Sequence, residues 1–183
     1  AGRMDLLERP HLAWHLSGGT TELLYVVPWG TAVKCEIIGG TSDVSAGQLI
    51  DRTGKLLGLN FPAGKELDRL SKAASVRERY DPRLDGLTFS LSGVEHKMKQ
   101  MLERGAEKAE AAFFSLDSII SAVERVTSRA LQKYGDLPVL YSGGVSSNSL
   151  LRERVEGIFP APEFATDNAM GTAILTYRAV REN

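Results

Sequence analysis

Cysteine is almost absent from this chain, with Cys35 as its single occurrence in 183 residues. A lone cysteine excludes a disulfide framework and a thiolate metal cluster, and it gives no indication of an oxidising compartment. No apolar run approaches the ~20 residues of a membrane-spanning helix. The first ten residues also lack the charged-then-apolar order of a secretory signal. We therefore expect a cytoplasmic protein with no membrane contact, whose first residues continue from a segment upstream.

Neither sign of charge dominates the sequence. Lys and Arg number 22 against 23 Asp and Glu, which leaves a formal net charge of −1. This balance gives no overall attraction to nucleic acid, so any RNA contact would be local or supplied by a partner. Apolar residues make up 43% of the chain, enough to bury a core, and the simplest expectation is one domain.

The first third of the sequence predicts strands followed by helices. Three β-rich runs between residues 11 and 38 are broken by Gly and Pro at hairpin-like intervals, which predicts a three-stranded meander. Apolar residues then recur at helical spacing up to Leu57, with Asp43 or Ser45 as the cap and Gly58 as the stop. A second short helix is expected a few residues later.

The remaining sequence predicts alternating helices and strands. Residues 75–92 have little periodicity and much charge, so we expect a surface excursion that ends in a short strand at 88–91. A long helical region follows, with a break near Gly105. The last part predicts a strand over 137–144, a helix over 145–158, an edge strand or loop over 160–166 and a closing helix from 167. A meander followed by such crossovers predicts an α/β fold, with a mixed sheet and helices on its faces.

Two histidines four residues apart, His11 and His15, raise the question of a metal site. On a helix this spacing would place both rings on one face, where they could bind a cation. Here Leu12, Trp14 and Leu16 alternate with them, which favours a strand. A strand separates the two rings by about 13 Å, so we expect them to share no metal.

The segment "SGGTTE" places Gly18 and Gly19 between two predicted strands. A Gly-Gly pair is a good hairpin signal by itself. It also lets the main chain approach a phosphate, with backbone N–H groups and the hydroxyls of Ser17, Thr20 and Thr21 as donors. The segment alone does not decide between these interpretations.

A second glycine pair favours binding. Gly143 and Gly144 follow a predicted strand and precede small polar residues that open a helix, whose N-terminus would attract an anion or a polar ring. A simple turn would need one glycine. We therefore expect the two turns to face each other across an adenine nucleotide, such as ATP or AMP.

Three carboxylates are candidates for the same site. Asp51 and Asp68 lie on predicted helices, where they are either solvated or bind ribose hydroxyls, as carboxylates do in nucleotide folds. Asp167 precedes a helix and could be a cap or a cation ligand. A single oxygen donor does not make a metal site.

Taken together, these motifs resemble a known family. "HLSGGTTELL", "SAGQLIDRTGKLLGLNFPAGKELDRLS", "FSLSGVEHK", "YSGGVSSNSLLRERV" and "FATDNAMGTAI" occur in the order found in the tRNA threonylcarbamoyladenosine transferases, once described as O-sialoglycoprotein endopeptidases. The resemblance implies the actin, hexokinase and chaperone ATPase superfamily, in which two ribonuclease-H-like domains clasp a nucleotide. Residues 1–183 look like the second, C-terminal domain, so we expect the family's N-terminal domain to be absent from this chain.

The resemblance also implies roles for individual residues. Positions that would line the phosphate or threonylcarbamoyl-adenylate end are Leu16, Ser17, Gly18 and Gly19, with Thr20 next to them in place of the family's usual histidine. Positions on the ribose side would be Asp51, Gly64 and Asp68. Asn148, after the pair Gly143 and Gly144, would meet the adenine, and Asp167 matches the family's metal-ligand aspartate. Ala63 replaces the first glycine of the family's PGGP turn.

The implied reaction moves a threonylcarbamoyl group from an adenylate to N6 of an adenosine in certain tRNAs, with iron or zinc as a Lewis acid. The family's histidine pair would lie upstream of Ala1, so Fe or Zn would need the missing N-terminal domain. We therefore expect the nucleotide-binding half of a transferase-like protein, which reaches tRNA indirectly. The alternatives are a non-catalytic paralogue that forms a homodimer or heterodimer within the family, and a glycoprotein endopeptidase. No Ser/His/Asp or Cys/His arrangement in the sequence favours the last.

Overall fold

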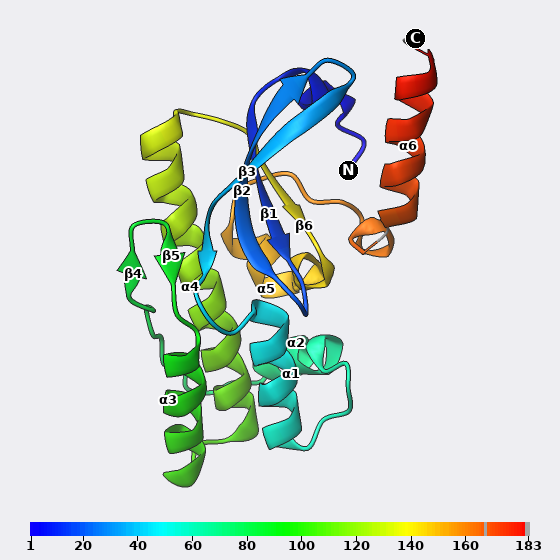
Figure 1. The fold of residues 1–183 in the computed structure, drawn as a ribbon. Helices are drawn as coiled ribbons and strands as arrows, with labels where there is room; N and C mark the ends of the chain where they lie inside the picture. The colour runs from blue at the N-terminus through cyan, green and yellow to red at the C-terminus, as the bar shows by residue number, and fades with distance from the viewer. Residues whose placement is uncertain (167, 182–183) are drawn as a thin grey trace.

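A computed structural model describes residues 1–166 and 168–181 as a mixed six-stranded sheet with helices (Figure 1). The strands lie in the order β4-β5-β3-β2-β1-β6. Their bounds are His11–Leu16 (β1), Thr21–Trp29 (β2), Ala32–Thr41 (β3), Leu84–Asp85 (β4), Thr88–Phe89 (β5) and Val139–Ser142 (β6). The helices are Ala46–Leu57 (α1), Gly64–Ser71 (α2), Ser92–Glu103 (α3), Lys108–Tyr134 (α4), Ser149–Arg154 (α5) and Asn168–Arg181 (α6), with short 3-10 turns at Met4–Glu8 (η1), Gly144–Ser147 (η2) and Pro162–Phe164 (η3).

The direction of the strands confirms the predicted mixed sheet. Strands β1, β2 and β3 form an antiparallel meander, as the alternating runs predicted. Strand β6 pairs parallel with β1, and β5 pairs parallel with the end of β3. The carboxyl ends of β1 and β6 therefore meet at one edge of the sheet.

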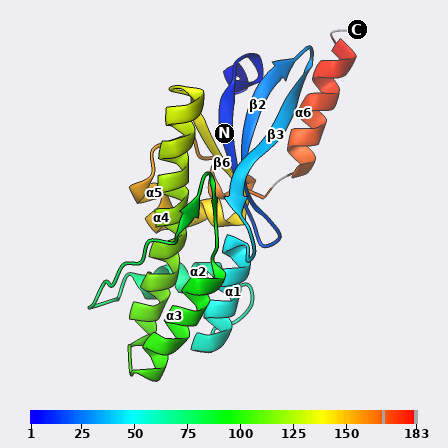
Figure 2. The same cartoon turned by 60° about the vertical axis from the view of Figure 1, so that its left-hand side comes forward.

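Helix α4 organises the core. Trp14 of β1 is fully buried, and its indole Nε1 donates to Thr127 Oγ1 of α4 at 2.8 Å. An apolar stripe of α4, which includes Ile119 and Val126, is buried. Ser115, Ser118 and Ser121 of this helix are buried too, because α1, α2 and α3 gather around the half of α4 that extends beyond the sheet (Figure 2). Helix α4 thus packs against both the sheet and the helices α1, α2 and α3, and joins them in one core.

Helix α1 begins and ends as its sequence predicts, and the structure selects between the two candidate caps. Ser45 Oγ accepts from the Gln48 backbone N at 3.2 Å, and the Gln48 side chain accepts in return from the Ser45 N–H. This capping box satisfies two N–H groups at the helix start. Gly58 ends the helix in the left-handed conformation, with φ of 78°. Asp43 is not the cap; its carboxylate binds elsewhere.

Several predicted boundaries were wrong. The helix expected over 145–158 is divided into η2 and the six-residue α5, because Asn148 adopts an extended conformation and caps α5 with its side chain. Of the two alternatives expected over 160–166, an edge strand or a loop, the structure has the loop, with a 3-10 turn at Pro162–Phe164. The excursion at 75–92 contains a second short strand, β4, which pairs with β5 around Gly86. In the described part of the chain, no helix is long and apolar enough to cross a membrane.

Candidate functional site

The two glycine turns lie next to each other at the edge where β1 and β6 end. His15 and Ser142 are register partners in the parallel pair, so the turns after them begin side by side. Gly143 has φ of +87°, and a side chain there would overlap the backbone carbonyl of Leu16. The structure therefore brings the predicted segments together. They are neighbours on one edge, however, and the expectation that they face each other across a shared cleft was wrong.

The four glycines differ in why they are needed. Gly143 is required by its conformation and by its contact with Leu16. Gly144 would allow a side chain, which would make an ordinary 3.5 Å contact with Thr166. At Gly18 and Gly19, no atom of the described residues lies within 4 Å of the position that a Cβ would take, and neither backbone is left-handed. Packing of the described chain thus requires one glycine of the four and leaves the Gly18–Gly19 tip open to an approaching molecule.

The hydroxyls next to this tip form hydrogen bonds within the protein, and their donation to a phosphate stays a prediction. Ser17 Oγ accepts from the Thr20 N–H at 3.0 Å and from the Gly19 N–H at 3.3 Å. Thr21 Oγ1 donates to the Thr20 carbonyl and accepts from the Ala46 N–H at 2.7 Å. Thr21 is also buried. These groups therefore shape the turn, and its outer backbone surface is what a ligand would meet.

The tip is fastened to the start of α1. Ser45 Oγ donates to the Gly18 carbonyl at 2.8 Å, and the Gly47 N–H donates to the Ser17 carbonyl at 3.1 Å. Gly47 lies so close to the turn that a side chain there would overlap Gly18. From the sequence, Ser45 was expected only as a cap, and Gly47 was not predicted to have a role. The signal was a glycine in the first turn of a helix, where nothing in the helix itself requires one.

Asp68 and Asn148 both serve as caps of α5. The Asp68 carboxylate accepts from the Ser149 backbone N–H at 3.1 Å and from Ser149 Oγ at 2.9 Å. Asn148 Oδ1 accepts from the Leu151 N–H at 3.0 Å, and the residue is 9% exposed. Asp68 thus reaches from α2 to the segment after the second glycine turn. Contacts of these two side chains with ribose or adenine stay predictions.

Asp51 lies on α1 at the edge of an open groove. Its Oδ1 accepts from the Ala63 N–H at 3.0 Å. Gly64, which begins α2, lies beside α1, where a Cβ would be 4.0 Å from the side chain of Ile50. The groove has a volume of about 280 Å³ and is lined by Asp51, Arg52, Lys55, Leu59, Asn60 and Phe61. It is the hollow that contains one of the predicted site residues.

The described residues do not form a metal site by themselves. His11 and His15 both lie on β1, as predicted, and His15 Nδ1 lies 3.2 Å from Ser142 Oγ. Among residues 1–166 and 168–181, no three His, Cys, Asp or Glu side chains come together in a way that could hold a metal ion. Asp167, the predicted metal ligand, lies outside the described residues. We therefore assign no metal-dependent step to the residues described.

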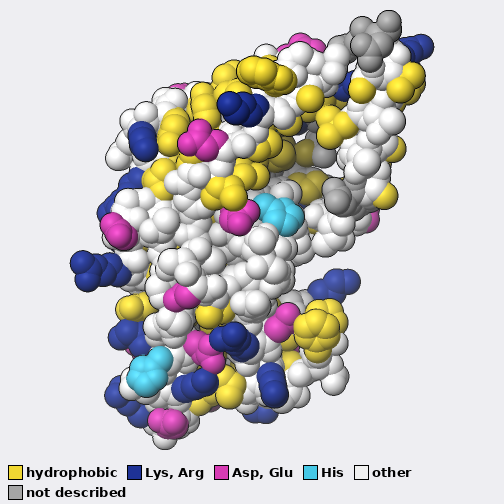
Figure 3. All heavy atoms as spheres, viewed as in Figure 1, with side chains coloured by type: hydrophobic (Ala, Val, Ile, Leu, Met, Phe, Trp, Pro, Cys, Tyr) yellow, Lys and Arg dark blue, Asp and Glu magenta, His cyan; other side chains and the backbone are white. Residues whose placement is uncertain are grey.

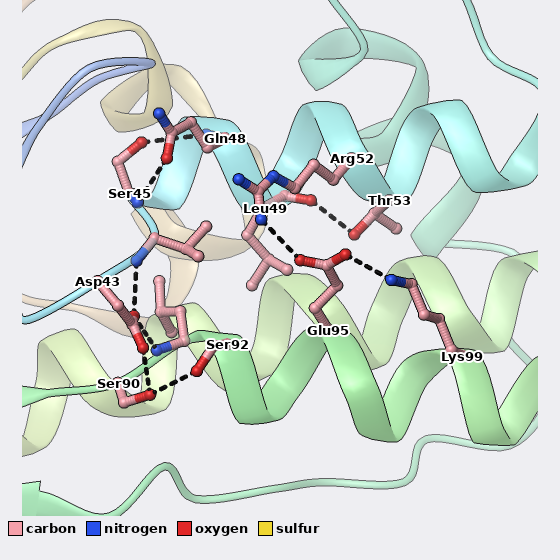
Figure 4. A network of polar contacts seen from close by, with 12 residues as sticks. Asp43, Ser45, Gln48, Leu49, Arg52, Thr53, Ser90, Ser92, Glu95 and Lys99 are labelled. Carbon is pink, nitrogen blue, oxygen red and sulfur yellow. Dashed lines mark hydrogen bonds and ion pairs between the residues drawn. The ribbon is translucent and has the colours of Figure 1, made fainter.

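A polar network that the sequence did not predict joins the start of α1 to α3 (Figure 4). Asp43 Oδ2 accepts from Ser90 Oγ at 2.5 Å, and Asp43 Oδ1 accepts from the Leu91 N–H at 2.9 Å and the Val44 N–H at 2.6 Å. Burial by itself would raise the pKa of Asp43. The hydrogen bonds outweigh it and hold that pKa well below the usual range of an aspartate. The ionised carboxylate thus fastens the segment after β5 to the loop that enters α1.

Further along the same interface, Glu95 of α3 lies between two cations. Lys99 Nζ donates to it at 2.7 Å and Arg52 at 2.9 Å. The hydrogen bond from Lys99 is the main cause that lowers the pKa of Glu95; burial opposes it, and Arg52 adds to the lowering. Arg52 also lines the groove beside Asp51, so this ion pair holds one wall of the groove in place.

Similarity to known proteins identifies the family to which this arrangement belongs. The family model described as tRNA N6-adenosine threonylcarbamoyltransferase matches residues 1–174. The chain belongs to this family. The transferase of Streptococcus gordonii is 34% identical over all of this chain and 57% of its own length, and a Thermus thermophilus transferase is 33% identical over 94% of this chain and 55% of its own. The chain therefore spans little more than half the length of these threonylcarbamoyltransferase relatives.

Solved structures of two other proteins resemble this transferase-family chain in their fold. Full-length HypF in its phosphate- and nucleotide-bound form superposes with a TM-score of 0.68 at 13% identity, over 85% of this chain and 31% of HypF. Component A of the (R)-2-hydroxyglutaryl-CoA dehydratase of Acidaminococcus fermentans gives a TM-score of 0.59 at 17% identity, over 92% of this chain and 62% of its own. At these identities the likeness concerns the fold alone. It confirms the predicted ribonuclease-H-like fold, a mixed sheet with helices.

Proposed function

We propose that this chain is the nucleotide-binding half of a tRNA threonylcarbamoyladenosine transferase-like protein, and that its ligand is an adenine nucleotide or adenylate. Membership of the threonylcarbamoyltransferase family and the ATPase-like fold support a role of this kind. The observation that carries the proposal is the open tip at Gly18 and Gly19. The packing of the described residues does not explain either glycine, whereas close approach of an anionic ligand to the backbone would.

In this proposal one end of the ligand binds to the turn at Gly18 and Gly19, and the other end binds beside α1. The phosphate or acyl-phosphate end lies against the outer backbone of Gly18 and Gly19. The ribose lies toward Asp51, whose Oδ2 has no hydrogen-bond partner among the residues that the structure describes. A free carboxylate oxygen of this kind suits a ribose hydroxyl donor.

The complete transfer reaction involves more than the residues described. Relatives such as the Streptococcus gordonii enzyme are almost twice as long as the part that this chain matches. In our proposal, the recognition of tRNA and any bound iron or zinc therefore depend on residues in addition to those described. The chain's own residues bind and orient the nucleotide, and the reaction would take place in the cytoplasm.

Calorimetry with ATP and AMP tests the glycine tip. In the double variant Gly18→Val/Gly19→Val, two side chains enter the space reserved for the ligand, so we expect the affinity to fall at least tenfold. Because nothing in the described chain occupies that space, the thermal unfolding midpoint should change little. The matched control is Gly171→Val on α6, where a side chain also meets open space. Equal nucleotide affinity in wild type and the double variant would contradict the proposal.

Two conservative variants test the other contacts without removing their structural roles. Asp51→Asn keeps an oxygen for the Ala63 N–H and loses the charge, so weaker binding would indicate a direct contact with ribose. Asn148→Asp keeps the cap of α5 and loses the amide N–H₂ group, so weaker binding would indicate a contact with the base. The same substitutions to alanine would also remove hydrogen bonds within the protein and would be less informative.

A further inference from the structure

The outer edge of strand β3 lacks a neighbouring strand along most of its length. Strand β5 pairs only with Gly40 and Thr41, at the end of β3. Residues 32–37 pair with β2 on one side and with no strand of the described chain on the other. The β2–β3 hairpin also extends beyond the rest of the sheet (Figure 1). An unpaired edge of this length is a template for another strand.

The surface at this edge is unusually apolar for an exposed hairpin. Ile37 is 62% exposed and Cys35 is exposed on the same face of β3, and Trp29 of β2, on the opposite face beside Lys34, is 68% exposed. Apolar side chains also gather over this upper part of the molecule in Figure 3, whereas charged side chains predominate over the lower helices. The edge therefore combines free backbone groups with side chains that gain from burial.

The hairpin turn determines which backbone groups face outward. Only Gly30 and Thr31 lie between the paired residues Trp29 and Ala32, and Gly30 has φ of 58°, as a two-residue hairpin loop requires. Such a loop closes on a hydrogen-bonded pair, and hydrogen-bonded pairs alternate with non-hydrogen-bonded ones. Residues 32, 34 and 36 therefore bond inward to β2.

The N–H and C=O groups of Val33, Cys35 and Ile37 consequently point away from β2, toward the free edge. The position of Pro28 agrees with this assignment. Pro28 lies opposite Val33, where the absence of an N–H group costs no bond between β2 and β3. The free edge thus offers three donors and three acceptors, spaced two residues apart.

We propose that this edge binds a second copy of the same chain, with the two β3 strands antiparallel and centred on Cys35. In this register Cys35 lies opposite Cys35 of the second copy. Val33 lies opposite Ile37 of the second copy, and Ile37 lies opposite Val33 of the second copy. All three pairs fall at positions whose backbone groups face outward, so about six main-chain hydrogen bonds form between the two copies. The result is a continuous sheet across the two-fold axis, and the site at Gly18 and Gly19 stays free.

Charge complementarity favours a second copy over an unrelated strand. Lys34 and Glu36 are both exposed and lie on either side of Cys35. Antiparallel pairing places each lysine opposite Glu36 of the other copy, at non-hydrogen-bonded positions where side chains approach most closely. Charges at a free edge usually prevent pairing. Here their order makes the edge complementary to itself and repulsive toward a copy shifted by two residues.

A charge-swap experiment tests the pairing. The oligomeric state of the full chain is measured by light scattering after size exclusion, over a range of concentrations, for wild type, Lys34→Glu, Glu36→Lys and the double variant. We expect the wild type to dimerise and each single variant to weaken the dimer about tenfold or more, because each places like charges opposite each other twice. The double variant exchanges the signs and should regain the wild-type dimer.

Matched controls separate this effect from others. Lys65→Glu changes the same charge on α2 and should leave the dimer intact. Lys34 also lies 5.8 Å from the centre of the Trp29 ring, so Glu36→Lys is the cleaner of the two single variants. A wild-type chain that stays monomeric at all concentrations would overturn the proposal, and so would a double variant no better than the singles.

Cross-linking tests the register. Mild oxidation by copper phenanthroline takes two electrons and two protons from a pair of thiols, and it should join Cys35 to Cys35 of the second copy. Facing residues in such a pair have Cα atoms about 5.5 Å apart, within disulfide range. Cys35→Ser should dimerise without cross-linking. The variant Cys35→Ser/Val33→Cys should not cross-link, because Val33 faces Ile37 of the second copy; cross-linking as efficient as that of Cys35 would overturn the register.

Discussion

The methyl group of Ala63 occupies the space that a side chain on Gly54 would need. Gly54 lies in α1 and Ala63 directly precedes α2, so this contact determines how closely the two helices approach. Ala63 is 1% exposed, and its N–H donates to Asp51 at 3.0 Å. Ala63 is thus accommodated by a glycine on the neighbouring helix.

The first prediction exchanges these two residues. Within a helix, Gly→Ala normally stabilises by up to about 1 kcal/mol. Gly54→Ala should instead destabilise by about 1–3 kcal/mol, because its methyl group overlaps that of Ala63. Adding Ala63→Gly should recover most of the loss. Urea unfolding measures the stability of wild type, Gly54→Ala and the double variant. Gly171→Ala is a control that should not destabilise the protein. A stabilised Gly54→Ala would show that the two helices lie further apart than described.

The second prediction compares the two glycines of the second turn. Gly143→Ala should strongly destabilise the protein, because it combines a left-handed backbone with overlap against the Leu16 carbonyl. Gly144→Ala adds only an ordinary contact with Thr166 and should stay within about 0.5 kcal/mol of wild type. Thermal unfolding of the two variants checks this difference, and similar midpoints would contradict it.

The third prediction concerns acid stability. The pKa of Asp43 is lowered in the folded protein, so the stability that its carboxylate contributes is present above the unfolded pKa of about 3.9. That contribution is lost as the pH falls through the folded value. Asp43→Asn should therefore be less stable than wild type at pH 7. The difference should shrink in acid, as measured by urea unfolding at a series of pH values; a constant difference would show that ionisation of Asp43 is not involved.

The fourth prediction concerns a buried ion pair between α4 and α5. Asp117 is 2% exposed and binds Arg154, which also binds Glu124. Burial raises the pKa of Asp117, and Arg154 opposes this effect. Arg154→Met should destabilise by about 3–5 kcal/mol at pH 7, because it leaves a buried carboxylate without its main partner. Urea unfolding measures the loss, which should be smaller at acidic pH, where Asp117 is more readily protonated.

The control for this ion pair is Arg129→Met. Arg129 is exposed, and its guanidinium donates to the Gly86 carbonyl at 3.0 Å. This substitution should change the free energy of unfolding by no more than about 0.5 kcal/mol. A comparable loss of stability in both variants would show that each arginine acts through packing of its aliphatic side-chain carbons rather than through the buried carboxylate.

Local sequence patterns predicted the elements of this fold well. Alternation around Trp14, a cap at Asp43 or Ser45 and the stop at Gly58 each depend on residues close together in the chain; the structure confirms the alternation and the stop, and selects Ser45 as the cap. Contacts between distant segments left weaker signals. The role of Asp68 as a cap of α5 could not be predicted, because it depends on α2 lying beside residues 148–149.

The candidate site shows the same division. The two glycine turns were predicted to face each other across a nucleotide; they are instead neighbours on one edge, because β1 and β6 are parallel neighbours. Their contact at Leu16 and Gly143 could not be predicted, since it depends on the tertiary approach of two backbones. The inward hydrogen bonds of Ser17 and Thr21 were missed for the same reason: a hydroxyl suited to a phosphate is equally suited to a helix N-terminus.

The attachment of the Gly18–Gly19 tip to α1 has a consequence for ligand size. Ser45, which holds the tip, and Asp51 are six positions apart, and a helix rises about 1.5 Å per residue, so they are separated by about 9 Å along a rigid rod. In the proposed binding mode, a ligand that contacts both the tip and Asp51 must span this separation. Inorganic phosphate or a free nucleoside would each reach only one of the two.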